Sequence, residues 1–337
     1  MFQKLLGSFD DGRLASQPIR TLAVIGVLGL LFAAPRLASA SDVRLLTQIL
    51  VFGLFALGYD VLYGYNGVVS FGHAVFFGLG GYLFGVPFTQ FGVESIWLML
   101  VLAVLGTALI GLLIGIVSVR TRDVYFSILT LIWALVVTTI IKNLEITGAH
   151  DGFSLSLPDL VLVPGTVSVS LYEQHVVYYL ALVCLLLTFL IANRLVRSPL
   201  GEVLQGGKAN SNRLTYLGYD ERKYRVVAFT ISCGIAGFAG ALQVILTGYV
   251  SPSLLSYLLS GEVILWTIIG GAGTLVGPIL GASVITLLEE SLSGLISWWE
   301  IPVGMIFIAI LIYMPDGIVG QVRTLFHSWA TRDESDE

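Results

Sequence analysis

The residues that could carry chemistry in this 337-residue chain are few and scattered. The four histidines show neither an HExxH pattern nor an acidic residue at the i+4 spacing of paired metal ligands on a helix; they are His73, His150, His175 and His327. No GxSxG elbow appears, so a serine hydrolase has no support. We therefore expect no metal site, no catalytic residue and no enzyme.

Two glycine-rich patterns are similar to nucleotide-binding loops but fail at defining positions. Residues 201–208, GEVLQGGK, are followed by Ala209, whereas a phosphate loop needs serine or threonine there. GLGGYL and GGAGTLVG carry Leu83 and Val276 in place of the last glycine of GxGxxG. The sequence therefore predicts no cofactor bound by this chain, and no pattern indicates a nucleic acid partner.

A third pattern is more informative because polar and small residues interrupt an apolar run. Residues 64–82, GYNGVVSFGHAVFFGLGGY, contain six glycines, and residues 270–278, GGAGTLVGP, form a second such break. Glycine-broken segments in matching places of two halves are typical of a transport pathway. We predict a pathway lined by Asn66, Ser70, Gly72, His73, Gly271, Gly273 and Thr274. Two alternatives stay open: His73 ties two helices together, and most of the glycines serve close helix packing.

Ionisable residues within apolar segments are costly, and they mark functional positions by default. Asp60 and Glu262 fall in such segments, although hydration near a membrane surface is an equal alternative for both. Together with His73, Asp60 also allows a hypothesis from another class, an ion-coupled secondary carrier.

The elements that must position these residues are membrane spans. Hydrophobic residues make up 56% of the chain and charged residues 12%, against about 25% charged residues in soluble domains. The mean hydropathy is +0.90. Apolar runs of about 20 residues cross a bilayer as helices. We predict an all-α integral membrane protein with ten spans, at 21–38, 43–64, 67–88, 95–118, 123–142, 173–193, 224–247, 258–270, 275–296 and 300–314.

The orientation follows from the lysines and arginines, which stay on the cytoplasmic side of short loops. With ten spans and both termini cytoplasmic, fourteen of the seventeen basic residues lie inside, and Arg36, Arg44 and Lys142 lie outside. The acidic tail within 321–337 is then cytoplasmic.

The chain divides into two sets of four spans around a polar interval. Residues 43–142 and 223–315 form the two sets, and the span at 173–193 inverts the second set relative to the first. Within the interval 194–222, Ser198 and Pro199 can start a short helix beneath the membrane, which Gly206 and Gly207 interrupt. A basic loop touching anionic lipid is the alternative for this interval. An external loop follows the fifth span and contains Gly148, Asp151 and Gly152, a candidate docking surface.

Five blocks, in order, resemble the LivM-type permease subunits of ABC importers for branched-chain amino acids and related amides. They are LYGYNGVVSFGHAVFFGLGGY, RDVYFSILTL, ITGAHDG, SPLGEVLQ with LGYDERKYRVVAFTIS, and SGEVILWTIIGGAGTLVGPILGA, and MPDGIVG follows near the C-terminus. The resemblance covers most of the chain.

This resemblance implies a vitamin-B12-permease-like (type II) fold in a bacterial or archaeal inner membrane. It also implies four kinds of partner: a second related permease, two ATP-binding subunits that hold the ATP-Mg, a soluble substrate-binding protein, and a small polar solute. The surrounding partner is membrane lipid. ATPase coupling would fall to Ser198, Pro199, Leu200, Gly201, Lys208, Asn210 and Gly218.

The chain departs from the family pattern at several positions. Lys208-Ala209-Asn210-Ser211 replaces a charged R-E-N-E run, and Asp60 stands where asparagine is common. Trp266 and the run SNRLTYLGYD are similar to urea-permease relatives, so urea or a short amide is the alternative solute to a branched-chain amino acid.

Overall fold

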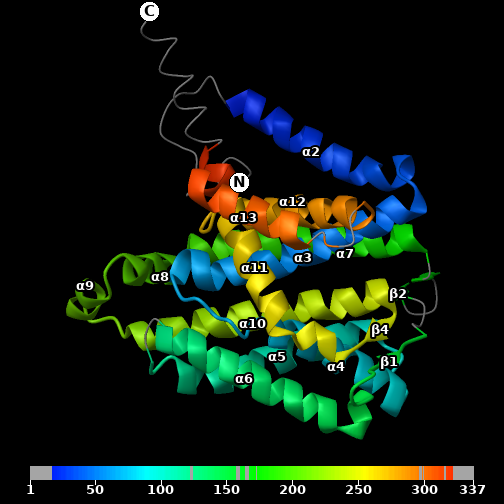
Figure 1. Ribbon diagram of the computed structural model, residues 1–337, viewed down its shortest axis with the longest axis horizontal. Helices are drawn as coiled ribbons and strands as arrows, with labels where there is room; N and C mark the ends of the chain where they lie inside the picture. Colours follow the sequence, from blue (N-terminus) through cyan, green and yellow to red (C-terminus); the bar gives the residue numbers. More distant parts are fainter. Residues whose placement is uncertain are drawn as a thin grey trace, which may run out of the picture.

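The computed structural model describes residues 17–121, 124–156, 160–163, 167–171, 173–295, 298, 300–314 and 316–321. The long helices run along one common direction (Figure 1). In chain order, the elements are α2 (Gln17–Leu37), α3 (Ala40–Asn66), α4 (Ala74–Phe91), α5 (Ile96–Ser118), α6 (Val124–Asn143), η3 (Glu145–Thr147), β1 (Phe153–Ser154), β2 (Leu160–Val163), β3 (Val167–Val169), α7 (Gln174–Val196), α8 (Pro199–Ala209), α9 (Ser211–Tyr216), α10 (Glu221–Thr247), β4 (Tyr249–Val250), η4 (Pro252–Leu255), α11 (Tyr257–Gly270), α12 (Val276–Ser293) and α13 (Glu300–Tyr313).

Helices occupy all ten ranges in which spans are predicted, and the protein is a multi-pass, mostly helical membrane protein. Among the described residues, eight helices are long and apolar enough to cross a bilayer. The helix α11, with 14 residues, is shorter than a full crossing, and α2 is not among the eight. The third span also starts later than predicted, at Ala74, because Gly67 ends α3 with a left-handed φ of 74°.

Two antiparallel helices, α3 and α10, form the centre of the bundle. In their most apolar windows, 78% of α3 and 72% of α10 is buried, against 28% of α6. Small residues allow this close packing, since no hydrophobic force joins helices in lipid. A Cβ added at Gly80 of α4 would lie 2.0 Å from the Gly237 carbonyl oxygen of α10. The packing alternative is thus confirmed for such glycines, Gly111 and Gly281 among them, because each contacts a neighbouring helix.

The helix α2 lies at the edge of the bundle and contacts α7 (Figure 1). The contact is made where Pro35 leaves a backbone carbonyl of α2 without its helical donor. Pro35 has no N–H to donate to the Leu31 carbonyl one turn earlier. The Tyr178 hydroxyl of α7 donates to that carbonyl instead, at 2.8 Å, and Tyr179 donates to Phe32 O at 3.0 Å. The α7 side chains therefore satisfy the backbone at the point where the α2 helix ends.

Short strands lie at the end of the bundle opposite α8 and α9 (Figure 1). The external loop contains β1, β2 and β3, in a region where the sequence predicted no strands. The strand β1 pairs antiparallel with β4, with Phe153 opposite Val250, and β2 pairs with β3. This pairing attaches the loop to the end of the central helix α10.

Candidate translocation and coupling site

The first glycine-broken segment, residues 67–73, is non-helical; Gly67 and Phe71 are exposed, and most of the other residues are buried. Backbone groups at membrane depth must find partners within the protein. Tyr59 Oη of α3 accepts from Ser70 N at 3.1 Å, and Ser127 Oγ of α6 donates to Val69 O at 2.7 Å. Ser260 Oγ of α11 accepts from Ala74 N at 2.9 Å. Side chains from three helices thus hold the segment in place.

His73 closes this segment at the N-terminus of α4 and is fully buried. Its Nε2 lies 2.9 Å from Ser232 Oγ of α10, and the Ser232 hydroxyl donates to Gly58 O of α3 at 2.6 Å. Because the single hydroxyl proton goes to Gly58, Nε2 is the donor to Ser232. Four aromatic rings surround the imidazole at centroid distances of 5.1 to 6.2 Å, those of Phe55, Tyr59, Phe76 and Phe229. This geometry links α4, α10 and α3 through one histidine.

The second glycine-broken segment, residues 271–275, joins α11 to α12. Asp60 Oδ1 accepts from Gly273 N at 2.7 Å and Oδ2 accepts from Leu275 N at 3.0 Å. Asp60 has no exposed surface, so the alternative of a hydrated interfacial carboxylate is wrong for this residue. The carboxylate lies at the N-terminus of α12, where free backbone N–H groups favour an anion.

The two broken segments lie at the same end of the bundle. The first separates the first and second helices of its set, whereas the second separates the second and third helices of its own. They are therefore not at matching positions. Of the seven predicted pathway residues, Asn66, Ser70, Gly72, His73 and Gly271 are buried, while Gly273 and Thr274 are partly exposed. The Thr274 hydroxyl donates to Gly271 O within the loop at 2.7 Å and accepts from Gly277 N in the first turn of α12 at 2.9 Å.

The coupling segment consists of two helices, α8 and α9, at the same end of the molecule (Figure 1). The predicted helix start is correct for Pro199 at the first turn, but Ser198 forms no cap and donates to Leu195 O at 2.6 Å. Gly206 and Gly207 do not interrupt α8, because Gly207 is buried against Leu214 of α9. Of the other predicted residues, Gly201 is buried against Val196 O, Leu200 is partly buried and Gly218 is exposed with φ 87°.

The two polar residues expected to face an ATPase make contacts within this chain instead. Lys208 Nζ donates to Gly64 O of α3 at 2.6 Å. Asn210 caps α9, its Oδ1 accepting from Arg213 N at 3.0 Å. The Lys208 contact joins α8 to the bundle, and the Asn210 contact fixes the start of α9.

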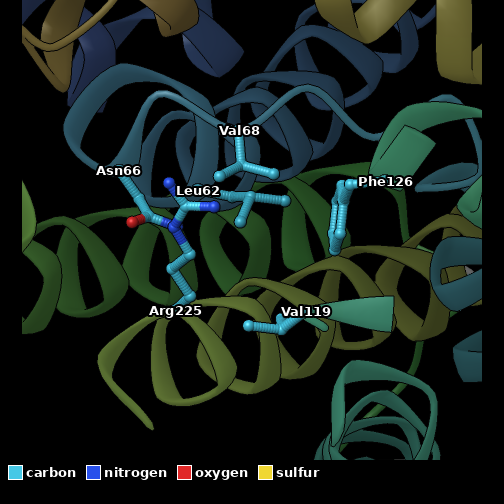
Figure 2. A pocket seen from close by; sticks show the side chains of 6 residues that line it. All are labelled: Leu62, Asn66, Val68, Val119, Phe126 and Arg225. Atoms are coloured by element: carbon cyan, nitrogen blue, oxygen red, sulfur yellow. The ribbon is translucent and has the colours of Figure 1, made fainter. Parts of the chain in front are cut away.

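A buried ion pair fixes the start of α10 beside this segment. Arg225 Nη2 lies 2.7 Å from Glu221 Oε1, and the two side chains are 14% and 10% exposed. The Ser211 hydroxyl of α9 is hydrogen-bonded to Glu221 Oε2. Arg225 also reaches into a narrow pocket beside Asn66, between the ends of α3, α5 and α10 (Figure 2). The pocket is lined by Leu62, Asn66, Val68, Val119, Phe126 and Arg225.

The predicted external loop is held against the other end of α10. Gly148 and Gly152 have left-handed φ values of 74° and 73°, and a Cβ at Gly152 would lie 2.0 Å from Val250 O of β4. The Tyr249 hydroxyl donates to the Asp151 carbonyl, and Asp151 is exposed. The helix α10 is therefore in contact with the coupling segment at one end and with the external loop at the other.

Several residues that hold the site were not identified from the sequence. They are isolated polar residues in apolar helices, and only their burial in the structure distinguishes them from other polar residues: Tyr59, Ser127, Ser232 and Ser260. Trp266, a position at which the sequence resembles urea permeases, is fully buried and packs on Phe52 with ring centroids 4.9 Å apart. In the described part of the chain, no group of three or more potential metal ligands is present.

Known proteins are similar to this chain over most of its length. The family described as branched-chain amino acid transport system / permease component matches residues 42–314. The chain is 28% identical over 322 residues to the high-affinity branched-chain amino acid transport system permease protein LivM of Escherichia coli K12, covering 90% of this chain and 75% of that protein.

Two further relatives are more distant. The permease protein BraD of Pseudomonas aeruginosa is 22% identical over 283 residues, covering 80% of this chain and 92% of that protein. The permease protein LivH of Escherichia coli K12 is 23% identical over 287 residues, covering 80% and 91%. No solved structure matches the chain significantly. The family match spans most of the sequence, so the chain belongs to the branched-chain amino acid transport system permease family.

Proposed function

We propose that the chain is one of two transmembrane subunits of an ATP-driven importer for branched-chain amino acids. The family match supports the transport role, and the curated relatives named above are branched-chain amino acid permeases. The chain has a higher identity to LivM than to LivH, which favours pairing with a second, LivH-like permease. The proposed architecture is the vitamin-B12-permease-like one, with two inverted sets of helices at 43–142 and 223–315.

The observation that carries the ATP-driven role is the projecting pair α8 and α9 (Figure 1). Tyr216 and Leu217, at the end of α9, are 90% and 69% exposed. Large apolar side chains exposed at the tip of a projecting element are typical of a protein interface. In our proposal these residues enter a groove on one of two ATP-binding subunits, which hold the ATP-Mg in the cytoplasm. In this proposal, both termini of the chain lie on the cytoplasmic side.

The opposite end of the molecule would then receive the soluble substrate-binding protein. Gly148 and Gly152 shape the loop there and Asp151 is exposed, which suits a docking surface. The solute would pass at the interface with the second permease. The hypothesis of an ion-coupled carrier loses support because both side chains make hydrogen bonds within the protein. Asp60 accepts from two backbone amides, and His73 is hydrogen-bonded to Ser232.

Co-purification and uptake test this proposal. The chain would be expressed with its neighbouring permease, ATPase and binding-protein genes, and the Tyr216→Ser/Leu217→Ser variant should lose most of the captured ATPase. The matched control is Tyr257→Ser/Leu258→Ser, which changes residues 54% and 63% exposed on α11. Vesicles with the intact complex should import leucine, isoleucine or valine only when ATP is present. Uptake at the same rate without ATP, or uptake of urea in preference to these amino acids, would contradict the proposal.

A further inference from the structure

The last turn of α3 contacts both the coupling segment and the loop before α12. The Gly64 carbonyl accepts the hydrogen bond from Lys208 Nζ of α8 at 2.6 Å. On its other side, a Cβ added at Gly64 would lie 2.4 Å from Gly273 N and 2.0 Å from Asp60 Oδ1. Glycine is therefore required at position 64 for α3, Asp60 and the loop to meet.

Asp60 contacts a loop in which Leu275 has a backbone conformation that non-glycine residues rarely adopt. Leu275 has a φ of 61°, although it is not glycine, and Gly271 and Gly273 have φ values of 113° and 84°. Positive φ costs a leucine free energy, so other contacts must stabilise it. The hydrogen bonds from Gly273 N and Leu275 N to the two buried carboxyl oxygens of Asp60 are such contacts.

Lys208 extends from α8 to reach this turn. Its side chain passes Gly67, where a Cβ would lie 2.9 Å from Lys208 Cγ. No carboxylate among the described residues lies within ion-pair distance of Lys208. Lys208 Nζ donates to Gly64 O, which lies one helical turn from Asp60.

We propose that Lys208, Gly64 and Asp60 form a mechanical connection that transmits movement of α8 to the loop 271–275 and the start of α12. This inference rests on the proposed ATP-driven function. When the ATPases displace α8, Lys208 moves the last turn of α3, and the Asp60 carboxylate moves the N-terminus of α12. Lys208 and Asp60 are thus positioning residues for coupling, and neither needs to contact solute or ATPase.

The test separates coupling from assembly in the complete complex in proteoliposomes. Lys208→Met, Asp60→Asn and the double variant are compared for captured ATPase, ATP hydrolysis and leucine uptake per ATP hydrolysed. Asp60→Asn keeps one acceptor oxygen and the side-chain volume, so it preserves folding better than alanine. The matched control is Lys223→Met, which removes a lysine that is 81% exposed in the same region and pairs with Asp220.

We expect Lys208→Met to keep the ATPase bound and active while uptake per ATP falls about tenfold, equivalent to about 1.4 kcal/mol. The double variant should fall no further than the more severe single variant, because both residues act in one connection. Unchanged uptake per ATP in Lys208→Met, or loss of ATPase capture in it, would overturn the inference. Absence of ATP-driven uptake by the unmodified complex would instead contradict the proposed function.

Discussion

The contact between His73 and Ser232 provides the sharpest test of whether the first broken segment has a structural role or meets solute. In Ser232→Ala, the buried Nε2–H of His73 loses its acceptor, the Ser232 hydroxyl. An unsatisfied buried donor costs about 1 to 3 kcal/mol. Measured hydrogen bonds between membrane helices average about 0.6 and reach about 1.7 kcal/mol. We therefore expect a loss of about 1 to 2 kcal/mol of stability, since neither side chain has exposed surface.

The second substitution in this test is His73→Leu, which removes the donor and keeps a similar volume. Ser232 then still donates to Gly58 O, so its hydroxyl proton keeps a hydrogen-bond acceptor. Adding Ser232→Ala to His73→Leu should therefore cost less than it costs in the unmodified chain. The difference, a coupling of about 1 kcal/mol, is measured with a double-mutant cycle.

Thermal unfolding in detergent, followed by size-exclusion of the folded fraction, is the assay. A change of about 1 kcal/mol corresponds to a shift of about 2 to 4 °C in Tm for a domain of somewhat smaller size. Ser291→Ala is the control, because its hydroxyl is exposed and donates within its own helix. The His73→Leu/Ser232→Ala variant should also retain uptake. If Ser232→Ala leaves Tm unchanged while His73→Leu abolishes uptake in an assembled complex, His73 meets the solute and our interpretation is wrong.

Three further predictions concern packing and polar contacts elsewhere in the bundle. Gly80→Ala should prevent folding, since its Cβ would lie 2.0 Å from Gly237 O. Gly261→Ala is the control and should be tolerated, because a Cβ there has no heavy atom within 4 Å outside its own helix backbone and chain neighbours. The yield of monodisperse protein measures both variants. Arg225→Met should cost about 3 to 5 kcal/mol by leaving Glu221 buried without its cation, and Glu221→Gln/Arg225→Met should recover part of that loss in Tm. Tyr178→Phe should release the end of α2 at a cost of about 0.5 to 1.5 kcal/mol, because Leu31 O loses its donor. Pro35→Ala should compensate by restoring a backbone N–H for Leu31 O. Limited proteolysis of the α2 region measures both effects, and equal cleavage of Tyr178→Phe and the unmodified chain would refute the prediction.

The helices themselves could be predicted because hydropathy depends on residue type alone. Apolar runs place helices at the ten predicted ranges, and the polar interval between α7 and α10 marks the coupling segment. The boundaries failed where tertiary contacts override local preference. The helix α8 continues through Gly206 and Gly207 because it packs against α9 and α10, and α4 starts only at Ala74 because side chains of three other helices hold residues 67–73.

The contacts of the site could not be predicted, for a reason that Asp60 makes clear. A carboxylate in an apolar run indicates a buried partner or a hydrated surface, and the sequence offers no means to choose. Its partners are the backbone amides of Gly273 and Leu275, 213 and 215 residues away. Every residue except proline carries an amide, so no residue type identifies them as donors. They become donors because the chain turns through positive φ at Gly271, Gly273 and Leu275 and α12 begins at Val276. The N–H groups of Gly273 and Leu275, just before that helix, then lie beside Asp60, one turn before Gly64, whose carbonyl accepts from Lys208. These contacts make the carboxylate part of the site.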